Sequence, residues 1–145
     1  MKNKEIKDAV QMLNKGNNCA QAIFSTFGPA LADIDEKTCL KIAEAFGGGI
    51  ARTGHVCGAL TGATMVLGLK YGGNKGEGQE KVNKVVREFL NEFKSIYGSI
   101  ICNELVGFDV ATITPEKIEQ VQKEGGFNKC IKIVEDVAIL VEKRL

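Results

Sequence analysis

Residues 82–97, VNKVVREFLNEFKSIY, carry the clearest structural pattern of the chain. Their apolar side chains recur at intervals of three and four residues, which is the spacing of one face of an α-helix. Charged and polar side chains lie between them, so this helix would present one face to a core and the other to solvent. Gly98 follows the segment, and glycine is common just after a helix end. The pattern predicts a long amphipathic helix in an α-helical protein.

Helical spacing recurs on both sides of this segment. After a glycine-rich loop at residues 47–56, an apolar run with many small residues is long enough to form a central helix that its neighbours approach closely. The further helices are predicted at residues 6–13, 19–27, 36–46, 57–71, 115–124 and 128–145, with a short segment at residues 102–105. The sequence therefore predicts a single compact all-α domain, residues 1–145, with six or seven helices.

Cap residues and apolar stripes mark several of these helices. Asn18 and Asp35 have side chains suited to N-cap positions, and Gly28-Pro29 is expected to end the second helix. Cys39 lies inside the third helix on the same apolar stripe as Ile42. We therefore expect Cys39 to pack in the core rather than to take part in chemistry.

The overall charge excludes a strong attraction to nucleic acid or anionic lipid. Lys and Arg number 19 against 18 Asp and Glu, which leaves a formal net charge of +1. Aromatic residues make up 6% of the chain and Trp is absent, so few side chains are suited to stack on bases. Nucleic-acid binding is therefore not expected.

Neither a membrane span nor a signal peptide is indicated. The most apolar window, residues 59–69, is about half the ~20 residues that a membrane helix needs. The first residues, MKNKE, run into an amphipathic stretch and not into the apolar core of a signal peptide. We expect a cytoplasmic protein.

Five cysteines are the main candidates for chemistry, and an odd number in such a chain favours thiol or metal chemistry over a disulfide framework. Four of them, Cys19, Cys57, Cys102 and Cys130, lie at or near predicted helix starts. Helix starts stabilise the thiolate, which is the form that binds metals and attacks disulfides. No C-x-x-C motif is present, so a joint site requires the tertiary fold. Because free cysteines also serve as small core residues, the spacing alone supports both interpretations.

The residues around Cys57 form a recognisable motif. The hexamer Cys57-Gly58-Ala59-Leu60-Thr61-Gly62 resembles the Cys-Gly-Ala-x-x-Gly core of the C_GCAxxG_C_C family of redox-active proteins. Residues 16–21 resemble the first cysteine segment of that family, and residues 46–54 its glycine- and arginine-containing stretch before the core. Cys102 and Cys130 occupy the places of the last two family cysteines, whereas Cys39 has no counterpart.

This resemblance implies a redox role in which the four family cysteines hold an iron–sulfur cluster or cycle as thiols. Thiolates from separate helices can ligate a [2Fe–2S] or [4Fe–4S] cluster, and nearby backbone N–H groups would hydrogen-bond its sulfides and raise its potential. The residues expected around the cluster are Gly49, Arg52, His55 and Gly58. The expected function is electron transfer to or from another redox protein, whose identity the sequence does not give.

Two of these surrounding residues have several possible roles. Arg52 would balance the charge of the cluster or lie at the surface as a solvated cation. His55 would move protons, replace a cysteine as ligand or be solvated. Residues 47–49, Gly-Gly-Gly, with Arg52 also have the composition of an anion cradle, but no phosphate-loop spacing accompanies them, so a tightly turning loop is favoured.

Two other functions stay open. The protein would be an enzyme if it were a thiol–disulfide oxidoreductase in which Cys57 attacks and another cysteine resolves. It would be a non-redox interaction module if the four thiolates bound a structural zinc ion, or if no metal were bound. A homodimer is expected if the apolar face of residues 82–97 stays partly uncovered.

Overall fold

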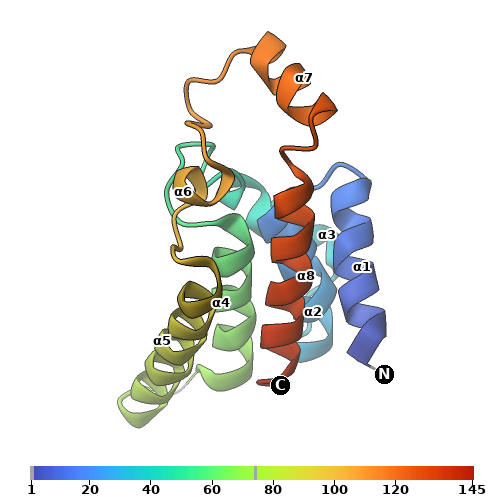
Figure 1. Cartoon of the computed structure of the whole chain (residues 1–145). Helices are drawn as coiled ribbons and strands as arrows, with labels where there is room; N and C mark the ends of the chain where they lie inside the picture. Colours follow the sequence, from blue (N-terminus) through green and yellow to red (C-terminus); the bar gives the residue numbers. More distant parts are fainter. Residues whose placement is uncertain (1, 74) are drawn as a thin grey trace.

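The computed structural model describes residues 2–73 and 75–145, and the fold of this part of the chain is helical (Figure 1). The described residues form eight α-helices and one short 3₁₀-helix. These are α1 (Lys2–Asn14), α2 (Cys19–Leu31), α3 (Glu36–Ala43), η1 (Glu44–Phe46), α4 (Gly58–Tyr71), α5 (Glu77–Tyr97), α6 (Cys102–Val106), α7 (Pro115–Lys123) and α8 (Asn128–Glu142). The all-α prediction is confirmed. The predicted number of six or seven helices was too low, because the short segment at residues 102–105 is itself a helix.

α4 lies within the bundle and is buried on several sides. Its fully buried side chains include Leu60, Val66 and Leu67. α2 packs closely against α4. The two backbones are so near that a Cβ atom at Gly62 would lie only 2.8 Å from the carbonyl oxygen of Ala20. The small residues of this segment thus permit the close approach that the sequence predicted.

α2 continues past the point where it was predicted to end. The helix runs to Leu31 with Pro29 inside its last turn. Proline lacks an N–H group, so it removes one hydrogen bond near the helix end, and the N–H of Ala32 still donates to the carbonyl of Gly28 (3.1 Å). Gly28 is buried, and its lack of a side chain makes room for Cys39, because a Cβ atom at Gly28 would lie only 3.1 Å from the Cys39 sulfur. Tertiary packing of this turn therefore overrides the stop signal.

α3 is shorter than predicted, because residues 44–46 form the 3₁₀-helix η1. Asp35 caps α3 as predicted: its side chain accepts a hydrogen bond from the N–H of Thr38 (2.7 Å). Cys39 is fully buried, which confirms its packing role, but Ile42 is 46% exposed. The predicted apolar stripe is therefore only partly covered by the bundle.

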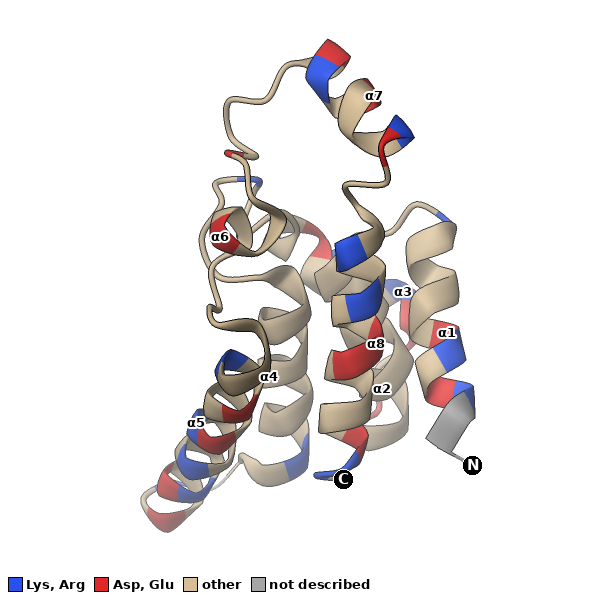
Figure 2. Ribbon diagram, viewed as in Figure 1, with Lys and Arg blue, Asp and Glu red and all other residues tan. Residues whose placement is uncertain are grey.

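The charged residues of α5 are exposed or half-buried, whereas α4 carries very few charges (Figure 2). Phe89 and Phe93 of α5 are fully buried, and Ile96 is 56% exposed. This arrangement confirms the amphipathic character predicted from residues 82–97. No helix in the described ranges combines the length and the apolar composition needed to cross a membrane.

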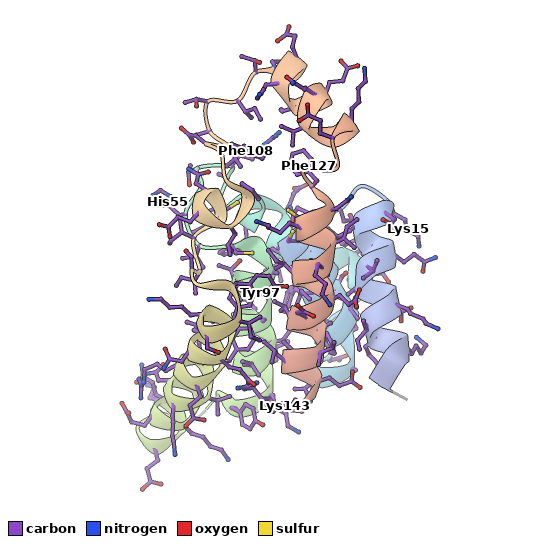
Figure 3. The ribbon with its side chains drawn as sticks, viewed as in Figure 1. Lys15, His55, Tyr97, Phe108, Phe127 and Lys143 are labelled. Carbon is purple, nitrogen blue, oxygen red and sulfur yellow. The ribbon has the colours of Figure 1, made fainter. Side chains whose placement is uncertain are left out.

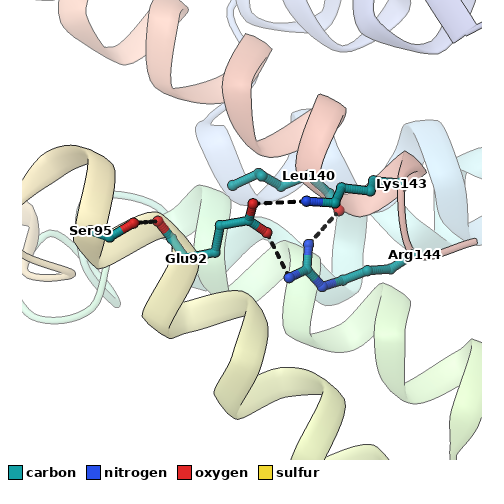
Figure 4. A network of polar contacts seen from close by, with 5 residues as sticks. All are labelled: Glu92, Ser95, Leu140, Lys143 and Arg144. Carbon is teal, nitrogen blue, oxygen red and sulfur yellow. Dashed lines mark hydrogen bonds and ion pairs between the residues drawn. The ribbon is translucent and has the colours of Figure 1, made fainter.

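A polar network joins α5 to the end of α8 (Figure 4). The carboxylate of Glu92 accepts hydrogen bonds from Lys143 (2.9 Å) and Arg144 (2.7 Å). Arg144 also donates to the carbonyl of Leu140 (3.0 Å), which orients its guanidinium. The network holds the last residues of the chain against α5, at the end of the bundle away from α7.

Residues 107–127, here called the arm, leave the bundle and return to it. The arm carries α7 beyond the end of the bundle at which α2, α4, α6 and α8 begin (Figure 1). Its two connections meet where the rings of Phe108 and Phe127 pack edge to face, with centroids 5.8 Å apart. The side chain of Asn103 accepts a hydrogen bond from the N–H of Val110 (2.9 Å), which ties the arm to α6.

Candidate four-cysteine site

Four cysteines lie at four helix starts, as the sequence predicted. Cys19 and Cys102 are the first residues of α2 and α6, Cys57 is the N-cap residue of α4, and Cys130 lies in the first turn of α8. All four helices begin at the same end of the bundle, below the arm (Figure 1). The fold therefore brings together residues that are far apart in the sequence.

These four cysteines line one cavity of about 620 Å³. Its roof includes Phe108 and Phe127, which Figure 3 shows between the bundle and α7. Cys57 is 6% exposed, and the other three cavity cysteines are partly exposed. Cys39 is not part of the wall, in agreement with its core position.

A capping box fixes the first of these thiols. The side chain of Asn18 accepts a hydrogen bond from the N–H of Gln21 (2.9 Å), and the N–H of Asn18 donates to the side chain of Gln21 (3.0 Å). Asn18 also donates to the carbonyl of Glu44 (2.9 Å), which connects the start of α2 to η1. Asn18 was predicted as an N-cap. Its bonds to Gln21 and Glu44 fix the backbone directly before Cys19.

A single backbone bridge fixes two further thiols. Val56 and Ile101 form an isolated antiparallel bridge. The N–H of Cys57 donates to the carbonyl of Ile100 (2.9 Å), and the N–H of Cys102 donates to the carbonyl of His55 (2.6 Å). This contact has no signal in the sequence, because one residue pair makes no alternating strand pattern.

The loop before Cys57 contains an unusual left-handed turn. Gly48, Gly49, Ile50, Ala51 and Arg52 have consecutive φ angles of 64°, 72°, 69°, 52° and 58°. Such a run is rare for residues with a Cβ atom, each of which costs about 1–2 kcal/mol in this conformation. The N–H groups of Gly54 and His55 close the turn by donating to the carbonyls of Gly48 and Gly49, both at 3.0 Å.

The four residues predicted around the cysteines lie in different places. Gly58 and Arg52 are on the cavity wall, whereas Gly49 and His55 are not. Gly49 is buried in the left-handed turn, where a Cβ atom would lie 2.5 Å from the backbone nitrogen of His55. The His55 side chain is exposed, and its Nδ1 lies 2.7 Å from the hydroxyl of Thr53.

Burial changes the acidity of the cavity thiols. Burial raises the pKa of Cys57 to about 12, although the nearby backbone N–H groups of Ala59 and Leu60 oppose this. Burial also raises the pKa of Cys102. The expectation that helix starts would favour thiolates was therefore wrong for these two residues, since loss of water outweighs the helix dipole.

Cys19 and Cys130 influence each other's acidity. The thiol of Cys19 interacts with that of Cys130, which raises the pKa of Cys19 and lowers the pKa of Cys130. Neither cysteine is in a disulfide. A thiol donating to a thiolate has these two effects, so Cys130 is the one cavity cysteine whose pKa is lowered, with help from the Lys129 charge.

The thiols surround the cavity without converging on one point. Within residues 2–73 and 75–145, no three Cys, His, Asp or Glu side chains are grouped closely enough to hold a single metal ion. A Cys₄ zinc site needs all four sulfurs at about 2.3 Å from one ion. An iron–sulfur cluster spreads its thiolate ligands over a cage with several irons, so four thiols around a cavity are a donor set that fits a cluster.

Sequence reasoning missed the far wall of this cavity. The arm supplies a set of apolar side chains, and they are Phe108, Val110, Ile113, Ile118 and Phe127. The available signal was the recurrence of apolar residues in the short stretch before Thr114, which no helix pattern explained.

Comparisons with known proteins agree with the motif. The family model described as "Putative redox-active protein (C_GCAxxG_C_C)" matches residues 17–144. A protein of Archaeoglobus fulgidus, described only as uncharacterized, is 27% identical over 106 residues, which cover 67% of this chain and 70% of the relative. No solved structure matches the chain. Because the family match spans all four cavity cysteines, the chain belongs to the C_GCAxxG_C_C family.

Proposed function

We propose that this protein is an electron-transfer module whose four cavity cysteines hold an iron–sulfur cluster. The observation that carries the proposal is that Cys19, Cys57, Cys102 and Cys130 come from four separate helix starts and line one cavity. Cysteine thiolates are the usual ligands of such clusters. Membership in a family described as redox-active supports the same conclusion.

The surroundings of the thiols suit a redox centre. A bound cluster would supply one-electron chemistry, and the chain would set its potential through hydrogen bonds and burial. The backbone N–H groups of Ala59 and Leu60, at the start of α4, lower the pKa of Cys57, and such groups stabilise added negative charge on the sulfur. The phenyl rings of Phe108 and Phe127 cover the cavity and limit the access of water.

A set of single serine variants tests the four ligands. Cys19→Ser, Cys57→Ser, Cys102→Ser and Cys130→Ser are purified without oxygen and compared by visible absorption with the parent protein. We expect each variant to lose most of the charge-transfer absorption, because serine is a poor cluster ligand. Cys39→Ser is the matched control, since Cys39 is buried outside the cavity, and it should keep the spectrum. Equal spectra for all five variants would contradict the proposal.

A second function, thiol–disulfide exchange, is favoured by the opposite pKa shifts of Cys19 and Cys130, which line the same cavity. In this reaction the Cys130 thiolate attacks a disulfide of a partner protein and releases one partner thiolate. Cys19 then attacks the Cys130 sulfur and releases the second, so two electrons and two protons pass to the partner and the Cys19–Cys130 disulfide forms. Cys57, the attacking residue expected from the sequence, suits this role less, because burial raises its pKa to about 12.

Thiol counting separates the two functions. An exchange enzyme should lose two titratable thiols on mild oxidation, and a mild reductant should restore them. Cys19→Ser should abolish this reversible change, whereas Cys102→Ser should leave it intact. An unchanged thiol count would exclude the exchange reaction.

A further inference from the structure

The four-cysteine cavity extends beyond the thiols toward the arm. The arm contributes five apolar residues to the outer wall, Phe108, Val110, Ile113, Ile118 and Phe127, together with the polar residue Gln122. The five apolar side chains contain no group that ligates iron. The total volume of about 620 Å³ lies in the range of about 300–1,000 Å³ that is typical of small-molecule sites. The cavity therefore has, on the side of the arm, a lining that the cysteine chemistry does not explain.

The left-handed turn places one cation on the wall of the same cavity. Arg52 is the last of the five residues with positive φ, and both Ala51 and Arg52 line the cavity. Two glycines give the turn its start, but the last three residues hold this conformation at a conformational cost. Backbone strain of this kind is commonly retained at ligand-binding positions. The turn thus fixes the backbone from which the guanidinium extends.

Arg52 is available to bind a ligand. Among the described residues, no hydrogen bond or ion pair engages its guanidinium, and the residue is exposed at the edge of the cavity. Of the residues that the structure describes, it is the one basic residue on the wall, and Glu44 is the one acidic residue. The side chains of Arg52 and Glu44 do not form an ion pair with each other.

We propose that the outer part of the cavity binds an organic anion with an apolar body. Its acidic group lies on Arg52, whose planar guanidinium donates paired hydrogen bonds to a carboxylate, sulfonate or phosphate. The body of the molecule lies against the arm, where burial of apolar surface stabilises it. Glu44 disfavours a second negative charge, so a monoanion is preferred. This site shares the cavity with the proposed cluster but does not depend on it.

Isothermal titration calorimetry with two matched probes tests the site on the full-length protein. The probes are 8-anilinonaphthalene-1-sulfonate and the neutral N-phenyl-1-naphthylamine, which share an apolar body and differ in the sulfonate. We expect both to bind one per chain. Arg52→Gln should weaken the sulfonate probe about tenfold and change the neutral probe less than twofold, since one charge-assisted contact is lost. Glu44→Gln should increase the affinity for the sulfonate probe. Ile113→Trp should lower the affinity for both probes, because the larger side chain takes up space in the cavity.

Arg87→Gln is the control, because Arg87 is an exposed cation on α5 outside the cavity. It should leave both affinities unchanged. Arg52→Lys keeps the positive charge but loses the planar guanidinium, so it should bind the sulfonate probe with an intermediate affinity. This second variant keeps the test valid if Arg52→Gln fails to fold. The proposal is overturned if the parent protein shows no saturable binding, or if Arg52→Gln affects both probes equally. Iron analysis of the same samples reports separately on the redox centre.

Discussion

Val56 and Ile101 pair in an isolated antiparallel bridge, and this bridge fixes the backbone at both Cys57 and Cys102. Each cysteine follows a bridge residue directly in the chain, and each cysteine N–H donates one of the two bridge hydrogen bonds. The starts of α4 and α6 are therefore fixed relative to each other by backbone, independently of the side chains that line the cavity. Two of the four thiols gain their relative position from this contact.

The cap of α2 should matter for both stability and cluster content. Asn18→Ala removes the capping box and the bond to Glu44, so we expect a loss of about 1 kcal/mol in the free energy of unfolding. Because Cys19 follows directly, the iron content should also fall. Asp35→Ala, which removes the cap of α3, should cost a similar free energy without lowering iron content. Equal iron content in both variants would contradict a positioning role for Asn18.

The contact between α2 and α4 should be sensitive to a single methyl group. Gly62→Ala places a Cβ atom 2.8 Å from the carbonyl oxygen of Ala20, so the two helices must separate. We expect a loss of about 1–3 kcal/mol, measured by chemical denaturation. Gly68→Ala in the same helix meets nothing within 4 Å and should instead stabilise the protein by about 0.5–1 kcal/mol. If both variants changed the free energy of unfolding in the same direction, the close approach of α2 would not be the reason for glycine at residue 62.

The left-handed turn should be stabilised by an additional glycine. Ala51 has φ 52° and is exposed, so Ala51→Gly relieves strain without losing buried surface. We expect a gain of about 0.5–1 kcal/mol, since the relieved strain exceeds the added chain entropy. Ala30→Gly, at an exposed helical position in α2, should cost about 0.5–1 kcal/mol. A thermal melt that shows Ala51→Gly to be destabilised would contradict this assignment.

The contact of Glu92 with the end of α8 should make stability depend on pH. Hydrogen bonds from Lys143 and then Arg144 lower the pKa of Glu92 from its ordinary value of 4.5. The stabilisation is therefore present above pH 4.5 and is lost as the pH falls through the lowered pKa of the folded state. Glu92→Gln should cost about 0.5–1 kcal/mol at pH 7, and this difference should vanish in acid. Glu88→Gln is the matched control for the substitution itself, because Glu88 is exposed on the same helix and, within the part of the chain that the structure describes, forms no ion pair with Lys143 or Arg144. It should change the stability at pH 7 by less than Glu92→Gln does.

The sequence predicted those features that depend on local chemistry. Asn18 and Asp35 are N-caps as expected, because their side chains bond N–H groups only three residues away. Cys19 lies at a helix start for the same local reason, because it directly follows the Asn18 cap. Cys39 is in the core because it shares a helix face with apolar residues.

Features that depend on distant contacts could not be predicted. Pro29 lies inside α2 because packing overrides its local effect, and Ile42 is exposed because the bundle covers only part of its stripe. The bridge between Val56 and Ile101 joins single residues without a strand pattern. The raised pKa of Cys57 reflects burial, which is a property of the whole fold.

The most direct test of the proposed function is the iron and acid-labile sulfide content of the parent protein, purified without oxygen. We expect both elements at two to four per chain, as in [2Fe–2S] and [4Fe–4S] clusters, together with charge-transfer absorption that bleaches on reduction. Zinc without sulfide would instead assign the four thiols a structural role. A protein that contains neither iron nor sulfide after anaerobic purification and after reconstitution with both would contradict the iron–sulfur proposal.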